Sequence, residues 1–163
     1  MNPSEYETLV AQIAQKFAKR WAGQRLETKC GRSCLVEGAS GFEHQIDVVL
    51  SWPETVSLIE CKRWRSSVGV EKVLAFHSRI LDIEKIEKRT VHGVMATTKG
   101  YQSGALRLLK HYGIDSFLVK SANDFVLQYK GHAGVGIQGV SASAQVGKVV
   151  AKVSSPKRAR AAT

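Results

Sequence analysis

Residues 56–62 read VSLIECK, a largely apolar run in which two of the last three side chains, Glu60 and Lys62, are charged. Alternate residues of a β-strand share one face, so Glu60 and Lys62 are predicted to continue the face of Leu58. Burying such charges is unfavourable unless they are paired or bind a metal ion. Residues 55–62 are therefore predicted to form a strand with a functional end, although a Glu60–Lys62 salt bridge alone would also explain the pattern.

A second acid lies in the preceding apolar segment. Residues 45–52 read QIDVVLSW and are predicted to form a strand that contains Asp47. Acids are depleted in strands and seldom buried, so this position is unusual. If the two strands pair through a turn at Pro53, Asp47 approaches Glu60 across the ladder. Two carboxylates repel unless a cation lies between them, and Mg²⁺ prefers such oxygen ligands. The pattern predicts a Mg²⁺ site with Lys62 beside it.

The chemistry expected of this site is hydrolysis of a phosphate ester. A divalent cation polarises a phosphoryl oxygen. It also lowers the pKa of a bound water molecule, which makes that water a nucleophile at neutral pH. Lys62 would orient the attacking water, help to take its proton, or stabilise the charge that develops on phosphorus. The residues leave these three roles of Lys62 open.

The charge of the chain predicts a polyanionic partner. Lys and Arg number 24 against 14 Asp and Glu, which gives a net charge of +10 over 163 residues. Neutralising phosphates releases condensed counterions and favours binding to nucleic acid. Arg63 and Arg65 follow the predicted site, and Lys99 precedes a predicted helix, so these three are expected to contact DNA. The alternative is that they are ordinary exposed side chains.

Periodicity elsewhere predicts an α/β fold. Apolar residues at helical spacing indicate a first helix from residue 4, with Ser4 and Glu7 as its capping box and Gly23 at its end. The strand at 33–37 is expected to join 45–52 and 55–62 in an antiparallel meander. The remaining predicted elements are helices at 70–81 and 101–112, the second capped by Gly113, and strands at 90–97, 114–119 and 125–129. This order predicts a mixed sheet flanked by helices.

Composition divides the chain into a domain at 1–130 and a tail at 131–163. The tail contains no Asp, Glu, Phe, Trp or Tyr, and is basic and of low complexity. Such a segment buries too little surface to offset the entropy of ordering, so a flexible tail is expected. It would either tether DNA electrostatically or only increase solubility.

The location of the protein is expected to be the cytoplasm. The chain has three cysteines, an odd number that argues against a secreted disulfide framework. Its first residues are polar rather than a signal peptide, and no apolar run approaches the roughly 18 residues of a membrane span.

Two runs resemble the PD-(D/E)xK restriction-endonuclease-like nucleases, in their Mrr-like branch. The first is GFEHQID at 41–47 with ECKR at 60–63, although Ile46 stands where the family's name has proline. The second is GVMATTKGY at 93–101, a strand that ends in Thr-Thr before a helix. The resemblance covers roughly residues 5–120. It implies an αβββαβ core, hydrolysis of phosphodiester bonds, and dependence on Mg²⁺, with Mn²⁺ tolerated.

The same resemblance implies a set of site residues. Asp47, Glu60 and Lys62 would be catalytic, and the metal ligands would be Asp47, Glu60 and the backbone carbonyl of Cys61. The family often carries a further carboxylate on its first helix. Glu7 is the matching residue, with the capping box as its alternative role.

The expected function is restriction-type cleavage of modified or foreign DNA. Three alternatives remain open: structure-specific cutting in repair, a nuclease fold that only binds DNA, and an enzyme that acts on RNA. A chain of 163 residues is expected to have no room for a separate sequence-reading domain, so specificity would come from DNA shape, from a partner protein or from a homodimer that matches the two-fold axis of the duplex.

Overall fold

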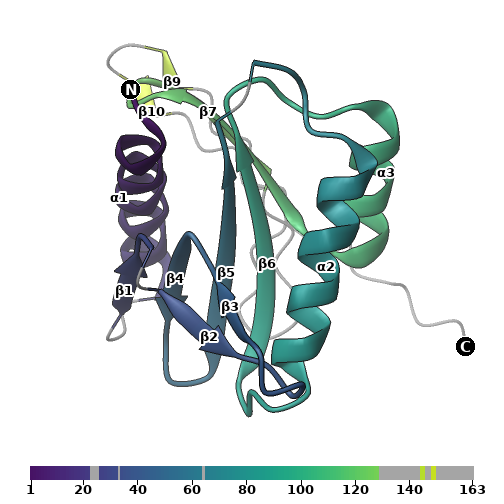
Figure 1. The fold of residues 1–163 in the computed structure, drawn as a ribbon. Helices are drawn as coiled ribbons and strands as arrows, with labels where there is room; N and C mark the ends of the chain where they lie inside the picture. The colour runs from purple at the N-terminus through teal and green to yellow at the C-terminus, as the bar shows by residue number, and fades with distance from the viewer. Residues whose placement is uncertain (23–25, 33, 64, 129–143, 146–147, 150–163) are drawn as a thin grey trace, which may run out of the picture.

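A six-stranded mixed sheet with helices on both faces forms the core of the molecule (Figure 1). The structure is a computed structural model that describes residues 1–22, 26–32, 34–63, 65–128, 144–145 and 148–149. The helices are α1 (Pro3–Ala22), α2 (Val70–Glu84) and α3 (Ser103–Tyr112). The strands of the main sheet, in spatial order, are β1 (Glu27–Cys30), β4 (Val48–Ser51), β5 (Thr55–Lys62), β6 (Thr90–Thr97), β7 (Asp115–Ser121) and β8 (Asp124–Gln128).

Strand directions follow from the connections. Short turns make β4 antiparallel to β5 and β7 antiparallel to β8, whereas the helical crossovers through α2 and α3 make β5, β6 and β7 parallel. In the β5–β6 pairing, Lys62 lies opposite Thr97. The carboxyl ends of these two strands therefore meet at one edge of the sheet. The α/β fold with a mixed sheet flanked by helices, predicted from the sequence, is confirmed.

Alternation along the strands separates two apolar layers. Leu58 and Met95 face α2 and α3, where they pack with Val73 and Phe76. The neighbouring strand residues face α1 on the other side of the sheet; they include Ile59, Val94 and Ala96, packed against Tyr6, Val10 and Ile13. Because both faces of the sheet are covered, neighbouring residues of one strand are buried on opposite sides, as Leu58 and Ile59 are in β5 and Val94 and Met95 are in β6.

A separate hairpin precedes the main strands and corrects the predicted meander. β2 (Leu35–Glu37) pairs with β3 (Glu43–Gln45) and not with the main sheet, whose outer place beside β4 is taken by β1. The predicted strand at 45–52 is broken at Ile46 and Asp47. The amide of Ile46 donates to the carbonyl of Cys34, and the amide of Gly31 donates to the carbonyl of Asp47. These bonds turn the chain from the hairpin into β4.

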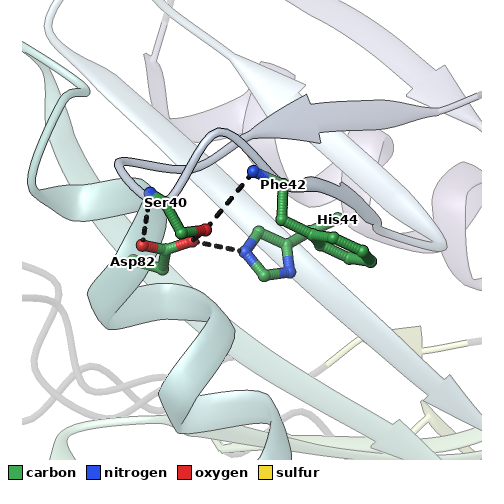
Figure 2. Close-up of polar contacts among 4 residues, drawn as sticks. All are labelled: Ser40, Phe42, His44 and Asp82. Carbon is green, nitrogen blue, oxygen red and sulfur yellow. Dashed lines mark hydrogen bonds and ion pairs between the residues drawn. The ribbon is translucent and has the colours of Figure 1, made fainter.

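The turn between β2 and β3 is fastened to α2 by Asp82 (Figure 2). The amide of Ser40 donates to Asp82 Oδ1 at 3.0 Å, and its hydroxyl donates to Oδ2 at 2.6 Å. His44 Nε2 lies 2.8 Å from the same Oδ2. The ring of Phe42, 65% exposed, meets the His44 ring edge-on. One carboxylate thus docks the hairpin that leads directly into Asp47.

The ends of the helices test the capping predictions. α1 is capped by Asn2 and Glu5, because Asn2 Oδ1 accepts from the Glu5 amide and Glu5 Oε2 accepts from the Asn2 amide. The predicted Ser4–Glu7 capping box is therefore wrong, and Pro3 suits the first helical position. The predicted stop at Gly23 lies outside the described residues. Gly113 ends α3 with a φ of 67°, as predicted.

The tail at 131–163 lies mostly outside the described residues. Within it the structure describes only β9 (Ala144–Gln145) and β10 (Lys148–Val149), which pair antiparallel. Its predicted flexibility therefore stays a prediction. Among the described helices, none combines the length and the apolar character that crossing a membrane requires.

Candidate active site

Asp47 and Glu60 face each other across two neighbouring strands. The β4–β5 register pairs Val48 with Ile59, so Asp47 stands opposite Glu60, one residue before β4 begins. The backbone amide of Cys61 donates a 2.7 Å hydrogen bond to Asp47 Oδ2. The approach of the two acids, predicted from the turn at Pro53, is present in the structure.

Glu60 is buried and carries a cationic donor on each carboxylate oxygen. Its exposed fraction is 4%. Lys62 Nζ donates to Oε1, and Arg79 Nη1 donates to Oε2 at 3.1 Å. The Glu60–Lys62 salt bridge, which the sequence left as an alternative reading, is therefore formed, and it is formed beside a second acid.

Arg79 is a site residue that the sequence reasoning missed. It lies on α2, three residues after Phe76 and four before Ile83, and both of these side chains are buried. A cation at a core-facing position of an amphipathic helix needs a partner inside the fold. The position of Arg79 between the buried residues Phe76 and Ile83 therefore indicates an acidic partner inside the fold, and the structure identifies this partner as Glu60.

The environment of Asp47 makes its charged form unfavourable. The pKa of Asp47 is raised to about 6, first by burial and next by the charge of Glu60. The hydrogen bond from Cys61 and the charge of Lys62 act in the opposite direction. Glu7 adds a smaller contribution that raises the pKa of Asp47. A cation between the acids would reverse this effect.

The donor set fits a divalent cation with oxygen ligands. Asp47 Oδ1 accepts no hydrogen bond from the described residues. In the described part of the chain, no three side chains of His, Cys, Asp or Glu gather closely enough to hold a metal ion. The protein would thus supply two carboxylates and, as predicted, the Cys61 carbonyl, with water and phosphate completing the shell, as Mg²⁺ commonly requires.

Two further predicted metal ligands, Glu7 and the Cys61 carbonyl, lie on α1 and on β5. Glu7 lies on α1 and does not belong to a three-ligand group with Asp47 and Glu60, so its role as a ligand stays a prediction. It is free of the capping role that was its alternative, because Glu5 fills that role. The side chain of Cys61 packs with the α1 layer, on the opposite face from Glu60, which leaves its backbone carbonyl as the group in question.

The predicted DNA-contacting residues lie at one edge of the sheet. Arg63 and Arg65 follow β5, and Lys99 follows β6; all three are exposed. These residues follow neighbouring strand ends, because Lys62 pairs with Thr97 at the end of the parallel β5–β6 ladder. An open pocket at this edge is lined by Thr98, Lys99, Leu118 and Lys120. Lys120 is thereby added to the basic edge, which the sequence alone did not show.

Solved structures share this fold. The chain is similar to a protein of unknown function, AF1548, with a TM-score of 0.58 and 23% identity, over 71% of this chain and 57% of that one. It is also similar to a repair endonuclease from Pyrococcus abyssi, with a TM-score of 0.48 and 15% identity, over 68% and 46% of the two chains. EndoMS bound to double-stranded DNA gives a TM-score of 0.48 and 15% identity, over 71% and 45%. The chain spans about half the length of these proteins.

Sequence comparison identifies the family. No curated protein matches the chain significantly. The family model of the Mrr catalytic domain, described as a restriction endonuclease, matches residues 1–119. That span contains Asp47, Glu60, the lysine beside Glu60 and the basic edge up to Lys99. Because the model covers well over half of the chain, the protein belongs to this restriction endonuclease family.

Proposed function

We propose that the protein is a metal-dependent DNA endonuclease that cleaves phosphodiester bonds of modified or foreign DNA. The observation that carries the proposal is the position of Asp47, one residue before β4 and opposite Glu60 of β5, with Lys62 on the same face as Glu60. A purely structural salt bridge explains Glu60 and Lys62 but gives no reason for a second, part-buried acid beside them. Membership of the restriction endonuclease family supports the choice of reaction.

The residues have separate tasks in this proposal. Asp47, Glu60 and the Cys61 carbonyl hold the ion, and Glu7 is a further candidate from α1. A divalent cation bound there supplies the charge that polarises a phosphoryl oxygen and lowers the pKa of a water molecule. The Cys61 amide keeps Asp47 aimed at the site. Lys62, held beside Glu60, orients the attacking water or stabilises the charge that develops on phosphorus.

The basic edge supports a polyanionic substrate. Arg63, Arg65, Lys99 and Lys120 lie where the carboxyl ends of the parallel strands meet. Exposed cations next to the site position a phosphate backbone without reading its sequence. Specificity would therefore come from DNA shape, from a partner protein, or from a homodimer that cuts both strands.

A cleavage panel tests the proposal and chooses the substrate. The full chain is incubated with plain duplex, methylated duplex, single-stranded DNA, branched DNA and RNA, with Mg²⁺, with Mn²⁺ and with EDTA. The proposal predicts cutting of duplex DNA, strongest when it is modified, that stops in EDTA. Preference for branched DNA would replace the restriction role with a repair role. Tight binding without cutting under any metal would contradict the nuclease.

A further inference from the structure

Arg79 occupies the carboxylate at which the proposed function places a cation. Glu60 is 4% exposed, and its two oxygens are taken by Lys62 and by Arg79, whose Nη1 lies 3.1 Å from Oε2. Each carboxylate oxygen has two lone-pair sites, so these two donors do not exhaust Glu60 as an acceptor. A divalent cation that binds Glu60 would instead add its charge beside two cationic groups that already neutralise the buried carboxylate, and one of these groups is then disfavoured at its present position.

Arg79 is the donor that is able to leave. Its side chain is 37% exposed, whereas that of Lys62 is 19% exposed. Lys62 stands two residues from Glu60 on the same face of β5, so its amino group is held beside the carboxylate by the strand itself. Arg79 reaches across from α2, and its long side chain can turn toward solvent without burying its charge.

The charge balance favours this exchange. With Asp47 and Glu60 ionised, Lys62 and Arg79 bring the local charge to zero. A divalent cation held by Glu60 would add two positive charges beside both basic groups, and the resulting repulsion would disfavour Arg79 at its present position. DNA phosphate offers the guanidinium another partner, since its planar fork binds phosphate through two parallel hydrogen bonds.

We propose that Arg79 is an exchangeable counter-ion. It pairs with Glu60 while the site holds no cation, and it pairs with a phosphate of bound DNA once a cation replaces it. The inference rests on the proposed function, because it assumes that Glu60 is a ligand. Its consequence is that cation and DNA strengthen each other's binding by the same factor, as thermodynamic linkage requires. The exchange would keep the site neutral until substrate arrives.

Calorimetric titration of the full chain with MnCl₂ tests the inference without measuring cleavage. The titration is made alone and with a phosphorothioate-linked duplex, and DNA affinity is measured by anisotropy with and without Mn²⁺. Arg79→Met, which removes the competitor, should bind Mn²⁺ on the order of tenfold more tightly than wild type in the absence of DNA. The gain in Mn²⁺ affinity that the duplex causes should be smaller in this variant by a similar factor.

A matched variant separates exchange from a general charge effect. Lys88→Met also removes one positive charge, but Lys88 is exposed in the segment before β6, at the opposite end of the strand from Thr97, and should leave both affinities unchanged. Circular dichroism checks folding, and Arg79→Gln replaces Arg79→Met if the latter does not fold. Equal Mn²⁺ affinities in Arg79→Met and wild type, or an equal rise in Lys88→Met, would overturn the exchange. A wild-type chain that binds no Mn²⁺ would reject the proposed function together with the inference.

Discussion

The backbone amide of Cys61 lies 2.7 Å from Asp47 Oδ2 and donates a hydrogen bond to it. This bond ties the segment before β4 to the end of β5, so that Asp47 and Glu60 are held opposite each other before any cation binds. Burial, and next the charge of Glu60, raises the pKa of Asp47 to about 6, so the ionised form of this side chain is unfavourable in the folded chain. The fold thus prepares a site whose unfavourable charge a cation would relieve.

Replacing Asp47 with Asn is expected to stabilise the metal-free protein at alkaline pH. The pKa of Asp47 in the folded chain, about 6, lies above its ordinary value of 3.8, so the folded chain holds this proton more tightly than the unfolded chain does. The stability that protonation of Asp47 gives the folded wild-type chain is complete below pH 3.8 and is lost as the pH rises through 6. In EDTA at pH 8, the free energy of unfolding of Asp47→Asn should exceed that of wild type by on the order of 1–2 kcal/mol, a figure that allows for solvent screening.

Denaturant unfolding at pH 4 and pH 8 measures this difference. The gain should be present at pH 8 and nearly absent at pH 4, where wild-type Asp47 is already protonated in the folded chain. Asp124→Asn, which removes an exposed acid at the sheet edge, is the control and should show no such gain. A gain of equal size at both pH values would contradict the electrostatic origin.

Removing Asp82 is expected to release the β2–β3 hairpin. The hydrogen bond from the Ser40 side chain, followed by that with His44, lowers the pKa of Asp82 below its ordinary value of 3.8. The stability from Asp82 is therefore present above that value and is lost as the pH falls through the lowered pKa. Asp82→Ala should lower the melting temperature at pH 7 and have a smaller effect at pH 3. Thermal unfolding measures both.

Glu84→Ala, an exposed acid on the same helix, is the control for the Asp82 variant. It should leave the melting temperature at pH 7 close to that of wild type. An Asp82→Ala protein as stable as wild type at pH 7 would show that the turn needs no anchor on α2.

Lys99 is expected to contribute to DNA affinity through a phosphate contact. Lys99→Ala should weaken binding to duplexes of different sequence by the same factor. It should also reduce the slope of log K against log salt concentration by about 1, because one fewer counterion is released. Fluorescence anisotropy over a range of salt concentrations measures the slope. Lys88→Ala, away from the basic edge, should leave the slope unchanged, and an unchanged slope in Lys99→Ala would exclude the contact.

The strands of the site were predictable from the sequence because their signals are local. β5 and β6 occupy 55–62 and 90–97, as their apolar, β-branched residues indicate. The pairing of Asp47 with Glu60 follows from the turn between two short strands, since register is fixed by the turn and by the alternation of buried side chains.

Other features depend on contacts between distant residues. β1 reads ETKC, with mostly exposed side chains and no apolar alternation, and it becomes a strand because its backbone pairs with β4. The contact of Arg79 with Glu60 joins a helix to a strand 19 residues away. The spacing of Arg79 on α2 points to an acid inside the fold but does not identify which acid. The cap of α1 was misplaced because Asn2 and Glu5 have the same three-residue spacing as Ser4 and Glu7.

Replacement of Lys62 with Ala shows whether Asp47, Glu60 and Lys62 form the cutting site. Single-turnover cleavage of duplex DNA in Mg²⁺ is measured for wild type and Lys62→Ala, with DNA affinity measured in parallel in EDTA. Lys62→Ala is expected to lose roughly 10²-fold or more in cleavage rate, while its affinity for DNA stays within a few-fold of wild type. Cleavage by Lys62→Ala at the wild-type rate, with affinity unchanged, would contradict the assignment of Lys62 to the cutting site.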